Sequence, residues 1–209
     1  MKFKLLKKHK KDSNKWLSRH INDEFVLKSK KEGFRSRSSY KLIQINEKFN
    51  FLNSSKNILD LGCAPGGWLQ VSKKFSSVDS KILGVDKLDI EAVPGVWFYK
   101  GDIFKDEVIS YIATFFEKKV DLIISDMSPN STGNKKIDHL RILSLVERVV
   151  DIANQFLQKD SFIVIKIFQG GMHGDLMNSL KQSFKNIKNF KPKASRKESP
   201  EMYLIAQKK

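Results

Sequence analysis

The fold of this 209-residue chain is decided by one stretch, which reads NILDLGCAPGG at residues 57–67. Its first five residues predict a short apolar strand, and a glycine-rich loop follows that strand at once. Glycines let the backbone turn tightly and approach a ligand, and a helix expected at residues 68–75 would offer its N-terminus there. This order is typical of a ligand-binding unit in a parallel sheet. The alternative is an ordinary strand-to-helix turn that is rich in glycine.

On either side of this stretch, short apolar runs alternate with helical stretches. Further strands are predicted at residues 82–86, 96–99, 120–125, 161–168 and 202–206, and further helices at residues 36–51, 106–116, 139–157 and 175–184. Near-continuous apolar strands that alternate with helices indicate an α/β fold with a mainly parallel sheet, covered by helices on both faces. The length fits one domain, and the sequence shows no internal repeat or linker that would divide it.

The first 34 residues are a polar and basic extension. Its apolar residues are Trp16, Leu17, Ile21, Phe25 and Val26. Their spacing predicts one short amphipathic helix that packs on the body of the protein. A mitochondrial targeting helix is the alternative, but such peptides avoid acidic residues and this stretch contains four. We therefore expect an extension at residues 1–34 and one folded domain at residues 35–209.

Composition excludes several classes of protein. Cys63 is the one cysteine of the chain, so a disulfide framework is excluded, and four scattered histidines with one cysteine do not form a zinc site of the usual spacing. No run approaches the ~18 consecutive apolar residues that span a membrane. The N-terminus also lacks an apolar core followed by a small-residue cleavage site. These features predict a soluble cytoplasmic protein that binds neither a membrane nor a metal.

The net charge of +16 is concentrated at the two ends of the chain. Residues 1–41 hold 14 basic and 4 acidic residues, and residues 181–209 hold 9 and 2. Residues 42–180 are nearly neutral, with 16 basic and 17 acidic residues. A neutral body with basic ends indicates a polyanionic partner, most commonly a nucleic acid. A lysine-rich composition with solubilising tails is the alternative interpretation. If the partner is RNA, the residues expected to contact its phosphates are Arg35, Arg37, Lys193 and Arg196.

Two acidic residues follow predicted strands at the edge where such sheets bind ligands. Asp86 ends the second strand about 20 residues after the glycine loop, where a carboxylate can accept hydrogen bonds from both hydroxyls of a ribose. Asp102 follows the third strand and can accept a hydrogen bond from an adenine amino group. Because the loop lacks the Gly-x-Gly-x-x-Gly pattern, the residues favour an adenosine-type ligand without a pyrophosphate. Either acid could instead cap its own loop.

A charged pair is predicted at the same edge. Asp126 follows the apolar strand at residues 120–125, and Lys166 interrupts the apolar strand at residues 161–168. A buried and unpaired ammonium is costly, so Lys166 needs a partner or must lose its charge. If the two strands are neighbours, Asp126 and Lys166 lie side by side. The alternative is a buried ion pair that only fixes the strand register.

Five motifs, in this order, resemble those of the FtsJ-like 2'-O-ribose RNA methyltransferases. They read RSRSSYKL at residues 35–42, DLGCAPGGW at 60–68, SDMSPN at 125–130, VIKIFQG at 164–170, and KPKASR at 191–196 continuing through EMY at 201–203. The resemblance covers about residues 14–207. It is closest to the bacterial branch that methylates uridine in large-subunit ribosomal RNA, because the opening NKWL at residues 14–17 also fits.

The resemblance implies a Rossmann-like, class I methyltransferase domain at residues 35–209 with a mainly parallel seven-stranded sheet. It implies that S-adenosylmethionine is the cofactor and that the methyl group is transferred to a ribose 2'-hydroxyl. The catalytic Lys-Asp-Lys-Glu tetrad of the family falls on Lys41, Asp126, Lys166 and Glu201. The cofactor contacts of the family fall on Gly66, Trp68, Asp86, Asp102 and Asp126.

Two departures from the family pattern concern the tetrad. Members commonly carry an aromatic pair before the first lysine, whereas here Ser39 precedes Tyr40. Near the second acid the sequence reads ESP at residues 198–200, so Glu198 is a rival for the tetrad acid. Glu201 directly precedes the last predicted strand, as the family pattern requires, and is therefore the expected member.

The expected chemistry agrees with the resemblance. The methyl group of a sulfonium is already activated, so the enzyme mainly aligns the reacting atoms. A lysine can take the hydroxyl proton only while its amine is neutral, a state that burial and a second nearby cation such as Lys41 favour. The two acids, Asp126 and Glu201, favour the charged form instead, so the sequence leaves the protonation state of Lys166 open.

The expected substrate is 23S ribosomal RNA of the large (50S) subunit, and we expect the enzyme to be a monomer. Alternatives are a tRNA or mRNA-cap methyltransferase, a catalytically inactive RNA-binding protein of the same fold, and a nicotinamide-dependent dehydrogenase. The missing dinucleotide glycine pattern disfavours the last of these.

Overall fold

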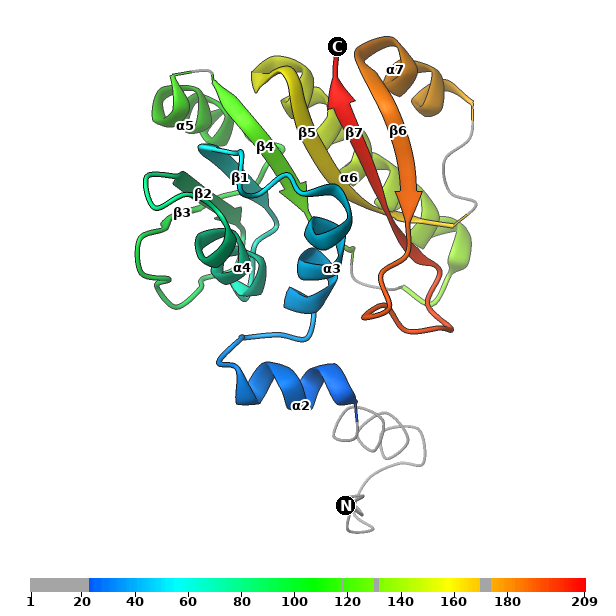
Figure 1. Ribbon diagram of the computed structural model, residues 1–209. Coiled ribbons are helices and arrows are strands. Elements are labelled where there is room, and N and C mark those ends of the chain that lie inside the picture. The colour runs from blue at the N-terminus through cyan, green and yellow to red at the C-terminus, as the bar shows by residue number, and fades with distance from the viewer. Residues whose placement is uncertain (1–22, 118, 130–131, 170–173) are drawn as a thin grey trace.

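Strands and helices alternate along the described part of the chain, which in the computed structural model comprises residues 23–117, 119–129, 132–169 and 174–209 (Figure 1). The strands are β1 (Asn57–Leu61), β2 (Lys81–Asp86), β3 (Trp97–Lys100), β4 (Val120–Ser125), β5 (Leu157–Phe168), β6 (Phe184–Phe190) and β7 (Glu201–Lys208). The helices are α2 (Glu24–Lys31), α3 (Ser39–Phe49), α4 (Gly67–Phe75), α5 (Asp106–Phe116), α6 (Lys135–Phe156) and α7 (Asp175–Ser183). The predicted α/β class is confirmed.

All seven strands join one sheet in the order β3-β2-β1-β4-β5-β7-β6. The pairs from β3 to β5 are parallel, and β7 runs antiparallel to both β5 and β6. The direction in which the chain adds strands reverses between β1 and β4, and such a reversal leaves a crevice at the carboxyl ends of the two strands. The fold therefore brings the loop after β1 and the loop after β4 to the same place.

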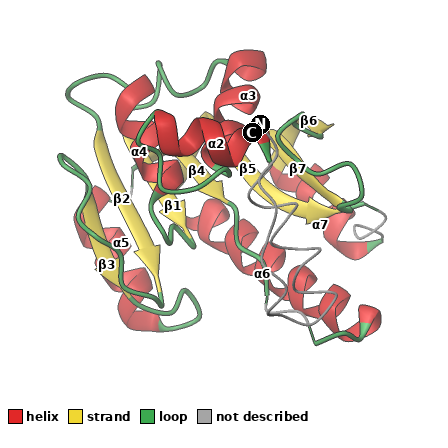
Figure 2. Ribbon diagram, turned by 90° about the horizontal axis from the view of Figure 1, so that it is seen from below, coloured by secondary structure: helices red, strands yellow, loops and turns green. Residues whose placement is uncertain are grey.

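Helices cover both faces of this sheet (Figure 2). On one face α3 and α4 contribute Leu42, Ile45 and Leu69 to a buried apolar cluster. On the other face α5, α6 and α7 build a second cluster, to which α5 contributes Ile112 and α6 contributes Val149. This two-layered covering is what near-continuous apolar strands require, because both sides of each central strand must be shielded from water.

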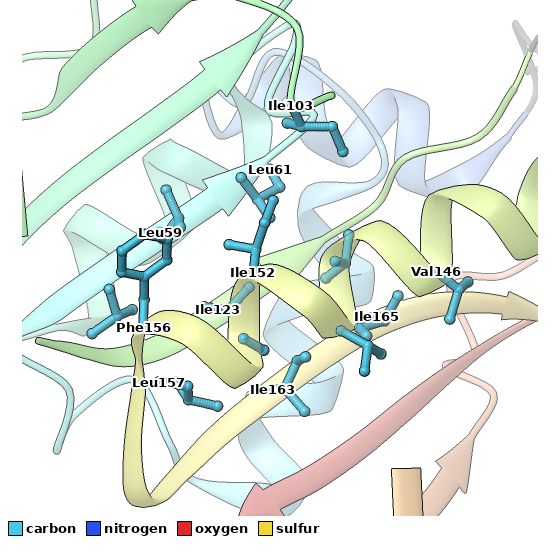
Figure 3. Packing of buried hydrophobic residues seen from close by; sticks show 14 of the residues in the cluster. Leu59, Leu61, Ile103, Ile123, Val146, Ile152, Phe156, Leu157, Ile163 and Ile165 are labelled. Atoms are coloured by element: carbon cyan, nitrogen blue, oxygen red, sulfur yellow. The ribbon is translucent and has the colours of Figure 1, made fainter. Parts of the chain in front are cut away.

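Strand β1 divides its side chains between the two clusters. Leu59 and Leu61 belong to the α6 side, where Figure 3 shows them beside Ile152 and Phe156. Ile58 belongs to the α3 side, as the alternation of a strand demands. Burying each such side chain stabilises the fold by ~1.5–3 kcal/mol. Asp60 lies on the α3 side with Ile58 and is only 1% exposed. It is the one charged residue of this strand.

Strand β6 was not predicted from the sequence. A helix was expected to end at residue 184 with no strand between residues 184 and 202, whereas the chain passes directly from α7 into β6. The strand is hard to recognise because only Phe184 is buried, and because a register shift against β7 lies between Lys185 and Lys188. Such an edge strand with a bulge lacks the alternation that marks a strand in a sequence.

The extension before residue 35 is described from residue 23 onward. Its helix α2 begins after Asp23 and buries Val26, and the ring of Phe25 lies 5.5 Å from that of Tyr40 in α3. Trp16, Leu17 and Ile21, which were also assigned to the amphipathic helix, lie outside the described residues. The boundary between an extension and a domain at residue 34 stays a prediction. Within the described part of the chain, no helix has the length and apolar character that crossing a membrane requires.

Candidate active site

A cavity of about 680 Å³ opens at the carboxyl ends of β1, β2 and β4. Its polar lining includes Asp86, Asp102 and Asp126, and its apolar lining includes Leu88 and Phe104. The volume falls in the range of sites for small molecules and cofactors, and the mixture of apolar walls with a few acids is typical of them. Three of the predicted cofactor contacts therefore meet in one cavity.

The glycine loop after β1 requires glycine at two positions. Gly62 has φ +77°, and a Cβ there would lie 1.9 Å from Met127 Cγ. Gly66 has φ +100°, and a Cβ there would lie 2.6 Å from Arg35 Nη1. Side chains other than glycine rarely adopt such angles, and at both positions a neighbour also fills the space. The loop is thus shaped by close approach as well as by turning.

Arg35 fastens this loop from the outside. Its guanidinium donates hydrogen bonds to three carbonyl oxygens, those of Pro65 (3.1 Å), Glu91 (2.7 Å) and Ala92 (2.8 Å). A planar guanidinium offers its donors in a fixed fork, so one side chain can join two separate loops. The sequence suggested Arg35 as a contact for a nucleic-acid phosphate, and that contact stays a prediction. In the structure its donors join the glycine loop to residues 91 and 92.

Asp86 and Asp102 each accept backbone hydrogen bonds in addition to facing the cavity. Asp86 accepts from Ala64 N and Leu88 N, both at 2.9 Å, which leaves one lone pair on each oxygen for a ligand. Asp102 accepts from Phe104 N at 3.0 Å. Burial raises the pKa of Asp102, but this N–H and the ammonium of Lys87, at 3.0 Å, outweigh burial and hold the pKa below its ordinary value. Asp102 therefore caps its own loop as well as lining the cavity.

The other two predicted cofactor contacts lie elsewhere. In the described part of the chain, neither Gly66 nor Trp68 lines the 680 Å³ cavity. The Trp68 indole lines a second cavity of about 30 Å³ instead, donates to Ser38 O at 2.9 Å and packs 5.7 Å from the ring of Tyr203. Its visible role is to join α4, the start of α3 and β7.

The four residues of the expected tetrad meet beside the cavity, although they come from α3, the end of β4, β5 and the start of β7. Lys166 Nζ lies 2.7 Å from Asp126 Oδ1 and donates to the backbone oxygen of Asp126 at 2.8 Å. Lys41 Nζ lies 2.8 Å from Glu201 Oε2. The cross distances are 4.0 Å from Lys41 to Asp126 and 3.9 Å from Lys166 to Glu201. The rival Glu198 is exposed, outside this cluster.

The cluster contains two positive and two negative charges in a nearly buried position. The four side chains are 9–17% exposed. Burial raises the pKa of the Asp126 carboxyl, but the charges of Lys166 and Lys41 outweigh it and hold the pKa below its ordinary value. Buried ion pairs of this kind contribute little net stability, because desolvation offsets the attraction. The alternative interpretation, that these charges only fix the strand register, therefore accounts poorly for four charged residues at the mouth of a cavity.

Comparisons with known proteins show the family to which the chain belongs. Residues 34–209 match the model of the FtsJ-like methyltransferase family. The chain belongs to that family. Curated relatives named ribosomal RNA large subunit methyltransferase E include those of Acidiphilium cryptum, 42% identical over 99% of this chain and 91% of the relative, and of Novosphingobium aromaticivorans, 44% identical over 99% and 92%.

Solved structures agree with the FtsJ-like assignment. A protein assigned as a ribosomal RNA methyltransferase from Plasmodium falciparum superposes with a TM-score of 0.73 at 32% identity, over 84% of this chain and 98% of that one. A protein assigned as a methyltransferase from Streptococcus mutans, solved in complex with SAH, gives a TM-score of 0.51 at 11% identity, over 79% and 97%. The latter shares the fold alone. The Rossmann-like methyltransferase fold predicted from the sequence is confirmed.

The site of this FtsJ-like chain also contains Tyr203, to which the sequence analysis gave no role. Its hydroxyl donates to Asp126 Oδ1 at 2.5 Å, and it stands opposite Lys166 in the register of β5 and β7. Burial and the charges of Asp126 and Glu201 raise the pKa of Tyr203, so the phenol stays neutral and keeps its proton to donate. A signal for it existed. Tyr203 follows Glu201 by two residues in a strand, which places both on one face.

Asp60 is the second residue that the analysis of this FtsJ-like sequence missed. Among the described residues, neither of its carboxylate oxygens has a hydrogen-bond partner, and both are buried. Burial raises the pKa of Asp60 well above its ordinary value, and the charges of Asp126 and Asp86 raise it further. Both effects favour the protonated, uncharged form of this carboxyl, which lines the smaller cavity beside Trp68.

The raised pKa of Asp60 predicts a pH dependence of stability. A group whose pKa is higher in the folded chain contributes stability that is present below about pH 4 and is lost as the pH rises toward the folded pKa. Asp60→Asn removes this titration. We expect the free energy of unfolding of Asp60→Asn, relative to wild type, to rise with pH above about pH 4, by at most ~1.4 kcal/mol per pH unit.

Urea unfolding at several pH values measures this difference. Asp79→Asn, at an exposed position, is the control and is expected to show no comparable trend. A difference between Asp60→Asn and wild type that stays constant with pH would contradict the prediction.

Proposed function

We propose that this FtsJ-like chain transfers the methyl group of S-adenosylmethionine to a ribose 2'-hydroxyl, in a uridine of 23S ribosomal RNA in the large ribosomal subunit. Relatives 42–44% identical over 99% of the chain, named for large-subunit ribosomal RNA, support the substrate. The observation that carries the reaction is the position of Lys166, which contacts Asp126 and faces Glu201 beside the cavity. We further propose that the enzyme acts as a monomer in the cytoplasm.

The cavity fits an adenosine-type cofactor. Asp86 retains lone pairs for the two ribose hydroxyls, Asp102 lies beyond it, and the apolar side chains of Leu88 and Phe104 can flank a purine. When bound, S-adenosylmethionine supplies a methyl group that its sulfonium has already activated. The remaining task of the protein is to place the hydroxyl oxygen in line with that methyl group and to take the hydroxyl proton.

Lys166 is suited to take that proton. A neutral amine has two N–H donors and one lone pair, and two oxygens of Asp126 lie within hydrogen-bond distance of Nζ. With both donors used, the lone pair is left for the 2'-hydroxyl. Tyr203 and Asp126 fix this orientation, while the ammonium of Lys41 stays paired with Glu201 and supplies the second cation. Lys166 is thus the proposed base, and the other three tetrad residues orient and tune it.

Methylation of purified substrates tests the proposal. Radiolabelled S-adenosylmethionine is supplied with isolated large ribosomal subunits, free ribosomal RNA, tRNA or capped mRNA, and the modified nucleotide is mapped. We expect 2'-O-methylation of a uridine in the large-subunit RNA. Transfer to tRNA or to a cap would correct the substrate. Binding of S-adenosylmethionine without transfer to any RNA would favour an inactive RNA-binding protein, and binding of NADH instead would favour a dehydrogenase.

Three of the four residues expected to contact RNA phosphates also have partners within the protein. Arg35, Arg37, Lys193 and Arg196 were the expected phosphate contacts. Arg35 holds the glycine loop, and Arg37 and Arg196 both pair with Asp23 at 2.9 and 3.9 Å. Exposed lysines remain on α2 and on the loop between β6 and β7, and both lie at the tetrad end of the sheet (Figure 1). They are Lys30, Lys31, Lys193 and Lys197.

Replacing these four lysines with alanine is expected to weaken RNA binding and to flatten its salt dependence. Each lost phosphate contact should lower the slope of log affinity against log salt by ~0.7–0.9, because fewer counterions are released. Affinity for S-adenosylmethionine should not change, since none of the four lines the cavity. Filter binding at several salt concentrations measures the slope.

A matched control replaces four exposed lysines that lie at the opposite end of the sheet. These are Lys56, Lys119, Lys159 and Lys209. This variant loses the same total charge, so only position distinguishes the two. Equal salt slopes in the two variants would show that RNA does not contact these lysines of α2 and of the loop between β6 and β7.

A further inference from the structure

Asp23 joins helix α2 to two arginines through the two oxygens of one carboxylate. Oδ1 caps α2 by accepting from Phe25 N at 3.0 Å and Val26 N at 3.3 Å. Oδ2 lies 2.9 Å from Arg37 Nη1 and 3.9 Å from Arg196 Nε. The Asp23 side chain is only 12% exposed. An N-cap needs a single oxygen, so the second oxygen does something that capping does not require.

The two arginines stand just before the two tetrad residues that pair with each other. Arg37 lies just before α3 and precedes Lys41 by four residues, and Arg196 precedes Glu201 by five. Lys41 and Glu201 form the 2.8 Å pair of the tetrad. The carboxylate of Asp23 therefore bridges the segment that carries Lys41 and the segment that carries Glu201, although these lie 160 residues apart in sequence.

Further hydrogen bonds connect the segment from residue 191 to 200 to α3 and to Glu201. Arg37 Nη2 donates to Ala194 O at 2.5 Å, and Ala194 N donates to the side chain of Gln44 in α3 at 2.9 Å. Ser199 O accepts from Lys191 Nζ at 2.6 Å, and the N–H of Glu201 itself donates to Ser199 Oγ at 3.3 Å. Figure 1 shows this loop beside α3 at the tetrad end of the sheet.

We propose that Asp23 is a positioning residue for methyl transfer, because its bridge between Arg37 and Arg196 sets the placement of Lys41 against Glu201. The inference rests on the proposed function and deepens it. It gives the helix before residue 34 a part in the chemistry in addition to any part in RNA binding. Small displacements of groups that align a reaction lower its rate strongly, even when the displaced residue is remote from the reacting atoms.

Electrostatic attraction to RNA makes the opposite prediction. Asp23 is an acid among basic residues. Its neutralisation removes one negative charge and so raises the net charge of the proposed RNA-facing end of the molecule by one. If charge alone mattered, this change would strengthen RNA binding and leave the chemical step as it is. If Asp23 positions the tetrad, the rate of the chemical step falls even though RNA binds at least as well. A split between kcat and KM therefore separates the two roles.

Asp23→Asn is the test variant, because asparagine caps a helix as well as aspartate does while it lacks the charge. We expect kcat for methyl transfer to fall about tenfold through misplacement of Lys41 and Glu201. KM for RNA and affinity for S-adenosylmethionine should stay close to wild type. The melting temperature of the variant shows that it is folded at the assay temperature. Glu24→Gln is the matched control, since Glu24 is the next residue, is exposed and loses the same charge. Its kcat should equal that of wild type.

A double-mutant cycle with Arg37→Gln completes the experiment. If Asp23 acts through Arg37, the double variant should be no slower than the slower single variant, because both changes break the same pair. A kcat for Asp23→Asn within twofold of wild type, or independent effects that multiply in the double variant, would overturn the inference. A wild-type chain that transfers no methyl group under the same conditions would overturn the proposed function and this inference with it.

Discussion

Lys166→Ala is expected to lower the rate of methyl transfer by ~10²–10⁴-fold, the usual contribution of a positioned base. The reason is that Lys166, the proposed base, lies against Asp126 and Glu201 at the mouth of the cavity. Affinity for S-adenosylmethionine should change little, because Asp86 and Asp102 remain in place. Single-turnover rates with saturating RNA, together with calorimetric titration of the cofactor, measure the two quantities.

Removal of a buried cation also leaves its partners uncompensated, which can destabilise a fold by ~3–5 kcal/mol. Lys166→Met, which keeps the apolar stem, and melting temperatures for both variants show whether the chain remains folded. Lys81→Met is the control. Lys81 also lies in a strand, but it is the first residue of β2, pairs with the first residue of β1 at the opposite end of the sheet, and its ammonium donates to Phe115 O. Turnover of Lys166→Ala within about threefold of wild type would refute its role as the base.

Asp86→Ala is expected to weaken the affinity for S-adenosylmethionine by ~1.5–3 kcal/mol, about 10- to 150-fold. The carboxylate is the expected acceptor for the ribose hydroxyls, and it also accepts from Ala64 N in the glycine loop. Loss of both interactions acts in the same direction. Calorimetry with S-adenosylmethionine measures the dissociation constant, and circular dichroism confirms the fold.

Asp89→Ala serves as the comparison for Asp86→Ala. Asp89 lies three residues further along, is 75% exposed in its side chain and pairs with Lys100 at 2.5 Å. Its removal costs the same charge in the same loop without touching the cavity lining. Equal dissociation constants for wild type and a folded Asp86→Ala would place the ribose contact on another residue.

The parts of the site that could be predicted from the sequence share one property. Asp126 and Lys166 are charged residues at or near the ends of otherwise apolar strands, and such residues stand out wherever a strand should be buried. Parallel strands also deliver their carboxyl ends to one edge, so the order of elements indicates where the loops meet. The close approach of Lys166 to Asp126 follows from β4 and β5 being neighbours.

The residues that could not be predicted depend on contacts between distant segments. Arg35 looked like a phosphate contact because it is basic, yet its carbonyl partners lie 30, 56 and 57 residues away. Arg37 meets Ala194 across 157 residues. No local pattern announces such partners, because a backbone carbonyl is offered by every residue. Net charge in a sequence therefore overstates the charge that is available to a partner.

The position of β7 has a consequence for the order in which the protein becomes competent during synthesis. This strand follows β5 and β6 in the sequence but lies between them in the sheet, and its first residue is Glu201. Until β7 leaves the ribosome, β5 and β6 each lack a neighbour, and Lys41 and Lys166 lack their second acid. Insertion of β7 between β5 and β6 completes the seven-stranded sheet and places the carboxylate of Glu201 beside Lys41 in the same step.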